Sequence, residues 1–270
     1  MSDAETRADG TDAGGRATDD ADGETTVQAT APAATWAAIV DPMEALVSEC
    51  RVRFGPSGVT LRATDPAKAA LVAVEAEQSA FETYRASETT VGVDVERLAE
   101  VVGLADGETT VTLRPETRRL RIEAGGVAYE TTVLEPDRVR DAPRRTALES
   151  EFDYEASFGT RAATVTRAVR AAELVSDHLV VRGDERGVAF EAAGDTDECV
   201  VRVDAAELAD PSLGPAESIF SLDYLSVVER AMPSDTAVSV WAGAETPMAV
   251  EYEATDGVCA EWVISPRIAR

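Results

Sequence analysis

Carboxylates are the most abundant chemically active side chains of this chain, and proteins use them as acid–base groups or as ligands of divalent cations. The sequence has 51 Asp and Glu against 25 Lys and Arg, so any pair chosen as a catalytic acid and base would be arbitrary. Asp195, Asp197 and Glu198 share one loop, but their spacing matches no defined cation-binding loop. We therefore predict neither a metal site nor a cofactor, and we keep a cation at this loop as the alternative.

The single histidine restricts the remaining catalytic chemistries. A Ser-His-Asp triad would have to use His178, and a histidine-rich metal site is impossible. His178 stands at the start of a predicted strand, which is more typical of a packed or solvated residue. The chain also lacks the glycine motifs of P-loops and dinucleotide-binding folds. These features argue against an enzyme, with an acidic hydrolase that works through carboxylates as the alternative.

The net charge of -26 comes with a strong bias among the basic residues, since Lys68 is the only lysine and the others are arginines. We interpret this combination as adaptation to concentrated salt, in which an acidic surface stays hydrated. The alternative is an acidic protein that avoids nucleic acid or binds cations. At ~1 M salt the Debye length is roughly 3 Å, so a negative surface hardly repels DNA at a distance.

The cysteines and the N-terminal sequence indicate a cytoplasmic protein that does not enter a membrane. Cys50, Cys199 and Cys259 form an odd number without a CxxC pair, which is typical of reduced thiols. There is no uninterrupted apolar run of ~18 residues, and the first ten residues lack the features of a signal peptide. The acidic stretch 1–24 predicts a disordered tail, either a solubilising extension or a docking arm.

An internal repeat at an offset of about 128 residues reveals the elements that must position these side chains. Residues 48–76 align with 176–205, and residues 91–113 align with 220–241. Apolar side chains alternate with polar ones in both copies of the first pair, as strands with one buried face do. A period this long indicates a duplicated domain rather than a short structural repeat.

Each copy reads as strand, helix, strands, helix and strands, the pattern of an α+β fold with antiparallel sheets. Apolar periodicity predicts helices over 34–49, 95–104, 160–175 and 222–231, with a kink or break at Pro42. In the first copy we expect strands over 25–30, between the helices up to 76, and over 109–113, 119–123 and 128–134. The polar stretch 135–150 predicts a linker between a first domain over 25–134 and a second over 151–270.

Five segments, in this order and spacing, resemble the DNA sliding clamps of the proliferating cell nuclear antigen family, most of all its haloarchaeal type. They are GVTLRATDPAKAALV at 58–72, VGVDVERL at 91–98, LVSDHL at 174–179, FSLDYL at 220–225 and SPRI at 265–268. The resemblance covers residues 25–268. It implies two similar processivity-fold domains, with antiparallel sheets outside and helices lining a pore, and three subunits that close head to tail into a ring.

The resemblance also implies a function, that of a homotrimeric DNA polymerase sliding clamp that encircles duplex DNA regardless of sequence and catalyses no reaction. The implied partners are DNA polymerase, a clamp loader, a flap nuclease and a ligase, in replication and repair at the nucleoid. The alternative within the fold is a divergent paralogue that binds partner peptides without encircling DNA.

Members of the family place basic residues on their pore helices, where these residues contact phosphates. The positions that match here are Arg97, Arg161, Arg167, Arg170 and Arg230. The alternative for each is an ordinary solvated charge on a helix surface. The predicted first helix departs from the family pattern because it has no basic residue, and Glu100 stands where a pore-facing lysine is usual. We therefore expect a less positive pore, with acidic groups at Asp41, Glu44 and Glu49.

The family binds short helical peptides with aromatic anchors in an apolar groove beneath the interdomain linker. The resemblance assigns nine positions to this groove: Thr64, Ala69, Leu71, Val139, Pro247, Val263, Ile264, Ser265 and Pro266. For Leu71 and Ile264 the alternative is plain core packing. Val139 is the one sizeable apolar side chain in a charged stretch of linker that is unusually basic, with Arg138, Arg140, Arg144 and Arg145.

Overall fold

The chain folds into two halves of the same design, which a computed structural model describes over residues 27–143 and 152–267. The first half contains β1 (Val27–Pro32), α1 (Ala33–Glu44), β2 (Glu49–Gly55), β3 (Gly58–Thr64), β4 (Ala70–Glu77), β5 (Thr83–Arg85), β6 (Thr89–Asp94), α2 (Val95–Gly103), β7 (Glu108–Arg114), β8 (Arg119–Ala124) and β9 (Val127–Thr132). Short 3-10 turns follow β4 and β9, at η1 (Gln78–Ala80) and η2 (Pro136–Arg138).

The second half repeats this order element by element. It contains β10 (Ala156–Arg161), α4 (Ala162–Glu173), β11 (His178–Asp184), β12 (Gly187–Ala193), β13 (Glu198–Asp204), β14 (Ala209–Ser212), β15 (Ala216–Ser221), α5 (Leu222–Ala231), β16 (Ala237–Ala242), β17 (Met248–Thr255) and β18 (Val258–Ile264), with η3 (Ala205–Glu207) after β13. The duplication predicted from the sequence is therefore confirmed.

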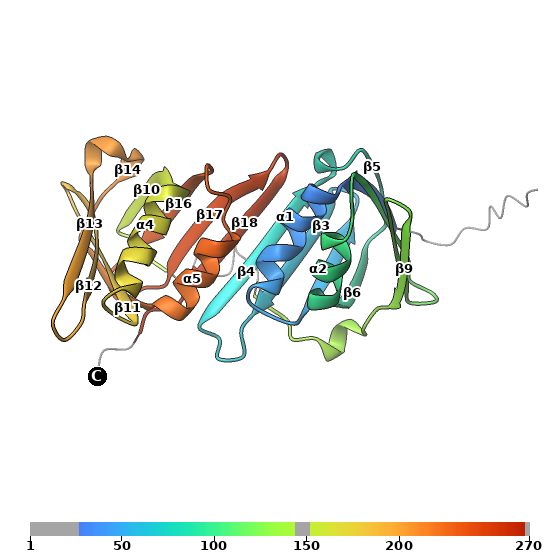
Figure 1. Ribbon diagram of the computed structural model, residues 1–270, viewed down its shortest axis with the longest axis horizontal. Helices are drawn as coiled ribbons and strands as arrows, with labels where there is room; N and C mark the ends of the chain where they lie inside the picture. The colour runs from blue at the N-terminus through green and yellow to red at the C-terminus, as the bar shows by residue number, and fades with distance from the viewer. Residues whose placement is uncertain (1–26, 144–151, 268–270) are drawn as a thin grey trace, which may run out of the picture.

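Antiparallel strands form three sheets that run along the molecule (Figure 1). Their orders are β5-β1-β7-β8-β9, β14-β10-β16-β17-β18-β4-β3-β2-β6 and β13-β12-β11-β15. The nine-stranded sheet joins the two halves because β18 pairs with β4, from Val258↔Ala76 to Ile264↔Ala70. Backbone hydrogen bonds therefore run without interruption from one half into the other.

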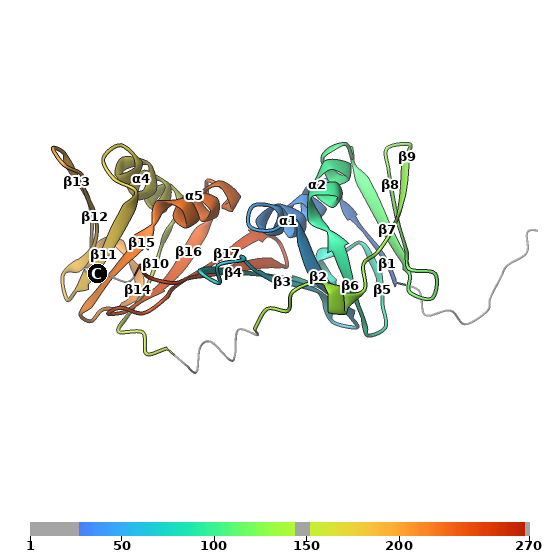
Figure 2. The same ribbon diagram turned by 90° about the horizontal axis from the view of Figure 1, so that it is seen from below.

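The α-helices of both halves lie in a row on one side of the sheets, in the order α4, α5, α1, α2 (Figure 2). Apolar side chains of these helices and the inward-facing residues of the strands make one core, which includes Ile39, Met43, Phe220 and Trp262. The face of the sheets that points away from the helices is called the outer face below. Within the described part of the chain, no helix is long and apolar enough to cross a membrane.

The predicted helix over 34–49 is wrong at its C-terminal end, since α1 ends at Glu44. Pro42 lies in the last turn, where it has no N–H to donate and weakens the continuation of the helix. The chain leaves through a turn closed by the hydrogen bond from the Val47 N–H to the Met43 carbonyl. Glu49 then pairs with Asp94 as the first residue of β2.

Pairing in the sheet also shortens the predicted helix over 160–175. Thr160 and Arg161 belong to β10, opposite Val238 and Ala237 of β16, so α4 begins at Ala162 and ends at Glu173. The helices predicted over 95–104 and 222–231 agree with α2 and α5 to within one residue. The predicted acidic tail 1–24 and much of the predicted linker lie outside the described residues.

Candidate nucleic-acid and partner-peptide interfaces

The second half of the helical face is the one with the predicted DNA-binding arginines. Arg161 occupies the N-cap position of α4 without a capping hydrogen bond from its side chain. Arg167 and Arg170 lie along that helix, and Arg230 lies in the last turn of α5. All four residues are exposed. Arg170 reaches across to Glu229 of α5 with 2.9 Å between Nη2 and Oε1, which ties the two helices together. This half of the helical face presents guanidinium groups to the space in front of the helices.

The first half of the helical face is acidic. Arg97, the fifth predicted DNA-binding residue, is exposed on α2 and lies 3.6 Å from the carboxylate of Glu100, one turn along. Helix α1 has no basic residue and exposes Asp41 and Glu44. Burial raises the pKa of Asp41, and the neighbouring Glu44 carboxylate raises it further. The two halves of the helical face therefore share a shape but differ in charge.

A groove of about 590 Å³ lies on the opposite face of the molecule, beside the linker. Six of the nine positions assigned to a peptide groove line it together: Thr64, Ala69, Leu71, Pro247, Val263 and Ser265. Leu71 and Val263 belong to a small apolar cluster on the outer side of β4 and β18, separate from the main core. Both side chains are nearly buried although they face away from the helices, because Ala142 of the linker and Tyr154 and Trp241 of the second half pack against this cluster.

The other three assigned positions lie elsewhere. Ile264 has no exposed surface and packs in the main core, because neighbouring residues of a strand face opposite sides of the sheet. Val139 packs against β6, where a Cβ on Gly92 would lie 2.6 Å from the Val139 Cγ2. Pro266 is half-buried beyond the groove lining. Gly92 lies inside the VGVDVERL segment, and a glycine within a strand is a sequence signal that another segment, here Val139, approaches the strand closely.

Asp65 lies beneath the turn that forms one wall of the groove, and no role was assigned to it from the sequence. Its carboxylate accepts hydrogen bonds from the backbone N–H groups of Ala67, Ala69 and Ala70 at 2.7–2.9 Å. The hydroxyl of Tyr224, on α5 in the other half, donates a fourth at 2.9 Å. Burial by itself raises the pKa of Asp65, but these hydrogen bonds outweigh it and hold the pKa below its usual value. One side chain thus connects the groove wall to a helix of the opposite face.

Two arginines fix the described part of the linker to the first half. Arg51 donates from Nε to the carbonyl of Val139 at 2.9 Å and pairs with Asp141 at 3.2 Å. Arg140 donates from Nη1 to the carbonyls of Asp65 and Pro66, both at 3.1 Å. The side of the groove formed by the linker is therefore held by guanidinium groups.

The surroundings of His178 do not support a catalytic triad. The Asp177 Oδ1 lies 2.8 Å and the Ser176 Oγ 3.0 Å from the same ring nitrogen, Nδ1. A triad requires the carboxylate and the hydroxyl on opposite nitrogens of the imidazole. Asp177 also pairs with Arg267 at 3.0 Å, so its carboxylate serves the local packing of the C-terminal segment.

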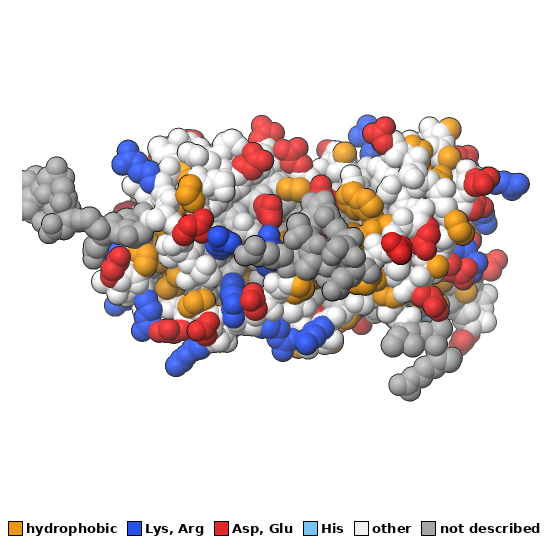
Figure 3. All heavy atoms as spheres, turned by 180° about the vertical axis from the view of Figure 1, so that it is seen from behind, with side chains coloured by type: hydrophobic (Ala, Val, Ile, Leu, Met, Phe, Trp, Pro, Cys, Tyr) orange, Lys and Arg blue, Asp and Glu red, His pale blue; other side chains and the backbone are white. Residues whose placement is uncertain are grey.

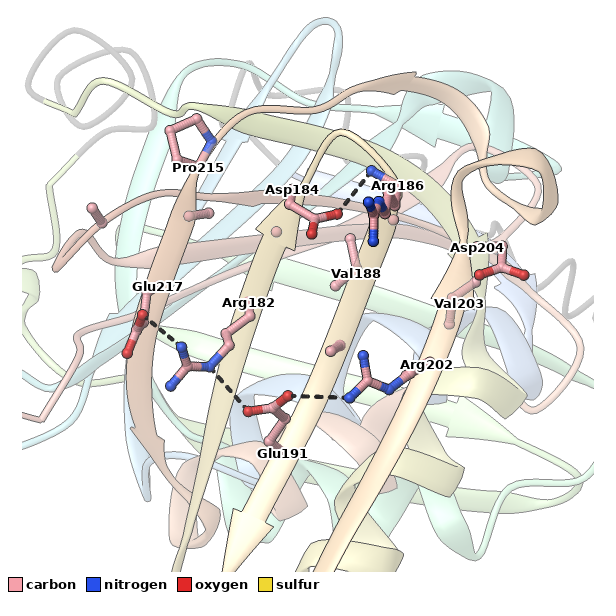
Figure 4. A pocket seen from close by; sticks show the side chains of 15 residues that line it. Arg182, Asp184, Arg186, Val188, Glu191, Arg202, Val203, Asp204, Pro215 and Glu217 are labelled. Atoms are coloured by element: carbon pink, nitrogen blue, oxygen red, sulfur yellow. Dashed lines mark hydrogen bonds and ion pairs between the residues drawn. The ribbon is translucent and has the colours of Figure 1, made fainter.

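A second cavity of about 510 Å³ lies on the outer face of β11, β12, β13 and β15 (Figure 4). Arg182 bridges Glu191 and Glu217 at 3.0 and 2.9 Å, and Arg202 lies 4.0 Å from Glu191. These arginines are therefore already balanced by carboxylates. The acidic loop with Asp195, Asp197 and Glu198 is exposed, and the described residues contain no cluster of three or more potential metal ligands.

Of the six strands that end the three described sheets, β9 and β13 lie at opposite ends of the molecule. β9 pairs only with β8, and β13 pairs only with β12, among the described strands. Figure 1 places β13 at the left end and β9 at the right end. Each carries an exposed apolar side chain, Val127 at 42% and Val200 at 45% exposure. Large exposed apolar residues on an open strand edge are a site for pairing with another chain.

Comparison with known proteins finds the same design throughout. Residues 29–123 match the N-terminal domain of proliferating cell nuclear antigen, and residues 149–267 match its C-terminal domain. The DNA polymerase sliding clamp of Natronomonas pharaonis is 36% identical over 239 residues, which are 87% of this chain and 95% of that protein. The sliding clamp of Haloarcula marismortui is 33% identical with the same coverage.

Solved structures agree with this relationship. A. fulgidus PCNA, bound to the C-terminal region of FEN-1, superposes with a TM-score of 0.84 at 29% identity, covering 90% of this chain and 99% of that chain. PCNA from Thermococcus kodakaraensis, at 21% identity and a TM-score of 0.79, shares the fold. The resemblance and the α+β fold of two similar domains are thereby confirmed. Because both domains match in order and haloarchaeal clamps align over most of their length, this chain belongs to the proliferating cell nuclear antigen family of DNA polymerase sliding clamps.

Proposed function

We propose that this chain is the subunit of a DNA polymerase sliding clamp, a ring of three copies that encircles duplex DNA. The observation that carries the proposal is the joint between β18 and β4, combined with the free edges of β9 and β13. In the repeat, β9 corresponds to β18 and β13 corresponds to β4. If β9 of one copy pairs with β13 of the next, the joint inside the chain is repeated between chains, and such a heterologous contact closes into a ring.

The repeat also gives the register of this joint between copies on the β9 side. Inside the chain, Trp262 of β18 lies opposite Val72 of β4 and opposite Val250 of β17. Tyr129 of β9 lies opposite Ile122 of β8 in the same way, and both Tyr129 and Trp262 face the helix side. Tyr129 is therefore the counterpart of Trp262.

The register on the β13 side follows from comparing the β3–β4 hairpin with its counterpart, the β12–β13 hairpin. Val72 pairs with Ala63 of β3, and Cys199 pairs with Ala192 of β12 at the equivalent position. Cys199 is therefore the counterpart of Val72, and it lies opposite Tyr129 of the adjacent copy. On the outer face the same register puts the exposed Val200 opposite Ala128. The pairing covers apolar surface on both faces of the new joint.

A disulfide cross-link tests both the ring and its register. Residues opposite each other in an antiparallel pair have Cβ atoms about 4.5–5.5 Å apart, within reach of a disulfide after a small adjustment. We expect Tyr129→Cys to form a disulfide with Cys199 of the next copy under oxidation. After oxidation of the variant in concentrated KCl, non-reducing electrophoresis should show a covalent species of three chains.

Two matched variants control this experiment. Cys199→Ser in the same background should abolish the cross-link, and Glu130→Cys, which faces the other side of the strand, should cross-link poorly. A Tyr129→Cys protein that stays a monomer by mass, or that links equally well without Cys199, would contradict the proposed joint.

Inside the ring, the helical faces would line the pore, and we propose Arg97, Arg161, Arg167, Arg170 and Arg230 as the residues that meet DNA phosphates. The acidic helices α1 and α2 support a second candidate, a paralogue that binds partners without encircling DNA. Retention on closed circular DNA separates the two. A clamp slides off when the circle is linearised, whereas the paralogue is not retained on either form.

The groove beside the linker supports the partner side of this function. We propose that Thr64, Ala69, Leu71, Pro247, Val263 and Ser265 receive a short segment of a DNA polymerase, flap nuclease or ligase, while a clamp loader opens the ring. Val139, Ile264 and Pro266 contribute indirectly, by holding the linker and the strand from which the groove is built. The protein would then work as a non-catalytic platform at the nucleoid in the cytoplasm, with its two domains divided at 135–150.

A further inference from the structure

The charges around the groove describe the segment that fills it. We propose that this segment is acidic, with carboxylates next to its apolar anchors, so that it docks as an acidic amphipathic peptide. The inference rests on the proposed function, because it takes the groove as the docking site for partners and adds the chemistry by which a partner is chosen.

The floor of the groove requires apolar anchors. Leu71 and Val263 form its centre, and Ala69, Phe152 and Pro247 surround them. Leu71 and Val263 are already nearly buried, so the apolar area that an occupant removes from water belongs mainly to the half-buried Ala69, Phe152 and Pro247. This part of the site would accept any peptide with apolar side chains of suitable size, so it does not by itself select among partners.

The rim of the groove is where selection by charge arises. Lys68, the only lysine of the chain, is exposed on the lining and has no ion pair with the described residues. Arg140, also on the lining, uses its Nη1 for two backbone carbonyls and likewise has no carboxylate partner there. The acidic residue that lines the groove, Asp141, is already paired with Arg51 at 3.2 Å. Among the described residues, these two cations therefore have no counter-charge when a segment enters the groove.

This arrangement differs from that of neighbouring arginines on the outer face. Beside the groove, Arg53 pairs with Glu88 and Arg62 with Glu75, both at 2.8 Å. Arg182, in the second cavity, is bridged by two carboxylates (Figure 4). Figure 3 shows both charges on this face, with Lys and Arg side chains gathered mainly over the first half of the chain, to the left of the grey segment. In a chain with a net charge of -26, an unbalanced pair of cations at an apolar groove favours an anionic partner.

Lys68→Gln would leave the groove apolar and remove only a charge, whereas Arg140→Gln also removes the hydrogen bonds to the Asp65 and Pro66 carbonyls. Two exposed ion pairs are together worth roughly a factor of ten in affinity. Salt weakens exposed ion pairs of this kind, because the Debye length falls from about 10 Å at ~0.1 M to about 3 Å at ~1 M. The charge preference should therefore be largest at the lowest KCl concentration at which the protein stays folded, and it should decrease as KCl rises.

The test uses three synthetic peptides with the same aromatic and aliphatic anchors and with acidic, neutral-amide or basic flanks. Their affinities for the full chain are measured by fluorescence anisotropy in KCl. For the unmodified protein we expect the acidic peptide to bind ~10-fold more tightly than the neutral one, and the basic peptide to bind most weakly. Lys68→Gln with Arg140→Gln should erase these differences between the three peptides.

Control variants separate charge from structure. Arg138→Gln removes a charge from the same linker outside the groove lining and should keep the preference. Since Arg140 also holds the Asp65 loop, Lys68→Gln alone and Arg140→Lys provide versions that change less of the structure. The single Lys68 variant should lose about half of the preference on a logarithmic scale, and Arg140→Lys should retain most of it.

The outcomes distinguish the inference from the function on which it rests. Equal binding of all three peptides, lost on Leu71→Asp, would keep the groove as a docking site and overturn the acidic preference. Stronger binding of the basic peptide, or a preference that survives in the double variant, would overturn it as well. If none of the peptides binds, both the inference and the proposed docking function are contradicted.

Discussion

At the scale of single residues, Asp65 connects three parts of the molecule, namely the turn after β3, the linker and α5 of the other half. No sequence motif predicted these contacts. It organises the turn that carries Lys68 and Ala69, accepts the hydroxyl of Tyr224 from the other half, and lies under the linker residue Arg140. Its side chain is only 5% exposed, so each of these hydrogen bonds satisfies a group that would otherwise be costly to bury. The groove wall and the joint between the halves therefore depend on the same carboxylate.

Asp65→Asn should lower the free energy of unfolding by about 1–3 kcal/mol, because an amide cannot accept every hydrogen bond that the carboxylate accepts. Chemical denaturation in KCl measures the loss, with Asp137→Asn on the exposed 3-10 turn η2 as the matched control. Tyr224→Phe should cost less, since it removes one donor only. A loss as small as that of the control would show that Asp65 is dispensable.

The same substitution has a defined pH dependence. The pKa of Asp65 in the folded protein lies below its unfolded value of ~3.9, so its stabilisation is complete above that pH and is lost as the pH falls through the folded-state pKa. The difference in stability between the native protein and Asp65→Asn should therefore shrink in acid. A difference that is constant or that grows in acid would contradict the hydrogen-bonded carboxylate.

Residues of the groove also show what a sequence can predict. Leu71 and Val263 were assigned by resemblance and lie together in the groove, whereas Ile264 was assigned with its neighbour although the alternation of a strand turns it into the core. The Asp65–Tyr224 hydrogen bond joins residues 159 positions apart, and no local sequence pattern predicts it. Contacts of this kind follow from how the halves dock, which periodicity alone does not specify.

At the scale of elements, the four helices form one face with two electrostatic characters. Helices α4 and α5 present Arg167, Arg170 and Arg230, while α1 and α2 present mostly carboxylates. The element types and most of their order were predictable because the apolar stripes are strong and the duplication doubles the signal. The ends were less predictable. Pro42 weakens α1 through its own backbone but does not fix the last residue of the helix, and the pairing of Arg161 in β10 sets the start of α4 through a tertiary contact.

Reversing the charge of α4 and α5 tests their role. The triple variant of Arg167, Arg170 and Arg230 to Glu should be retained ~10-fold less on closed circular DNA, since three phosphate contacts become repulsions. Its trimeric mass should stay unchanged because these side chains are exposed on the helical face and belong to neither β9 nor β13. Arg53, Arg85 and Arg182, which are exposed on strands, changed together to Glu, make a control with the same change in net charge. Equal retention of both variants would remove the helical arginines from the DNA site.

At the scale of the whole molecule, the acidic surface and the ring must be compatible. The proposed joint puts Glu130 of β9 opposite Glu198 of β13 in the next copy, and like charges directly opposite on paired strands are destabilising. Concentrated salt screens this repulsion, since the Debye length falls to about 3 Å at ~1 M. Assembly is thus expected to depend on salt more steeply than the folding of each copy does.

Neutralising this pair should lower the salt requirement of the trimer. Glu130→Gln is expected to tighten self-association about 2- to 5-fold at moderate KCl and to change it little in concentrated KCl. Sedimentation velocity across a KCl series measures the shift. Glu116→Gln, an exposed carboxylate of the β7–β8 turn, is the matched control. A trimer whose salt dependence is the same in both variants would contradict the register proposed between β9 and β13.

The continuous pairing of β18 with β4 helps to determine the angle between successive copies in an assembly. The angle at which one half meets the other is set within each chain by hydrogen bonds, the Asp65–Tyr224 contact and the linker. If the joint between chains adopts the same angle, every step around the assembly turns by an equal amount. A single subunit then already contains the curvature of the finished object, and a change of a few degrees at β18–β4 would turn a closed circle into an open spiral.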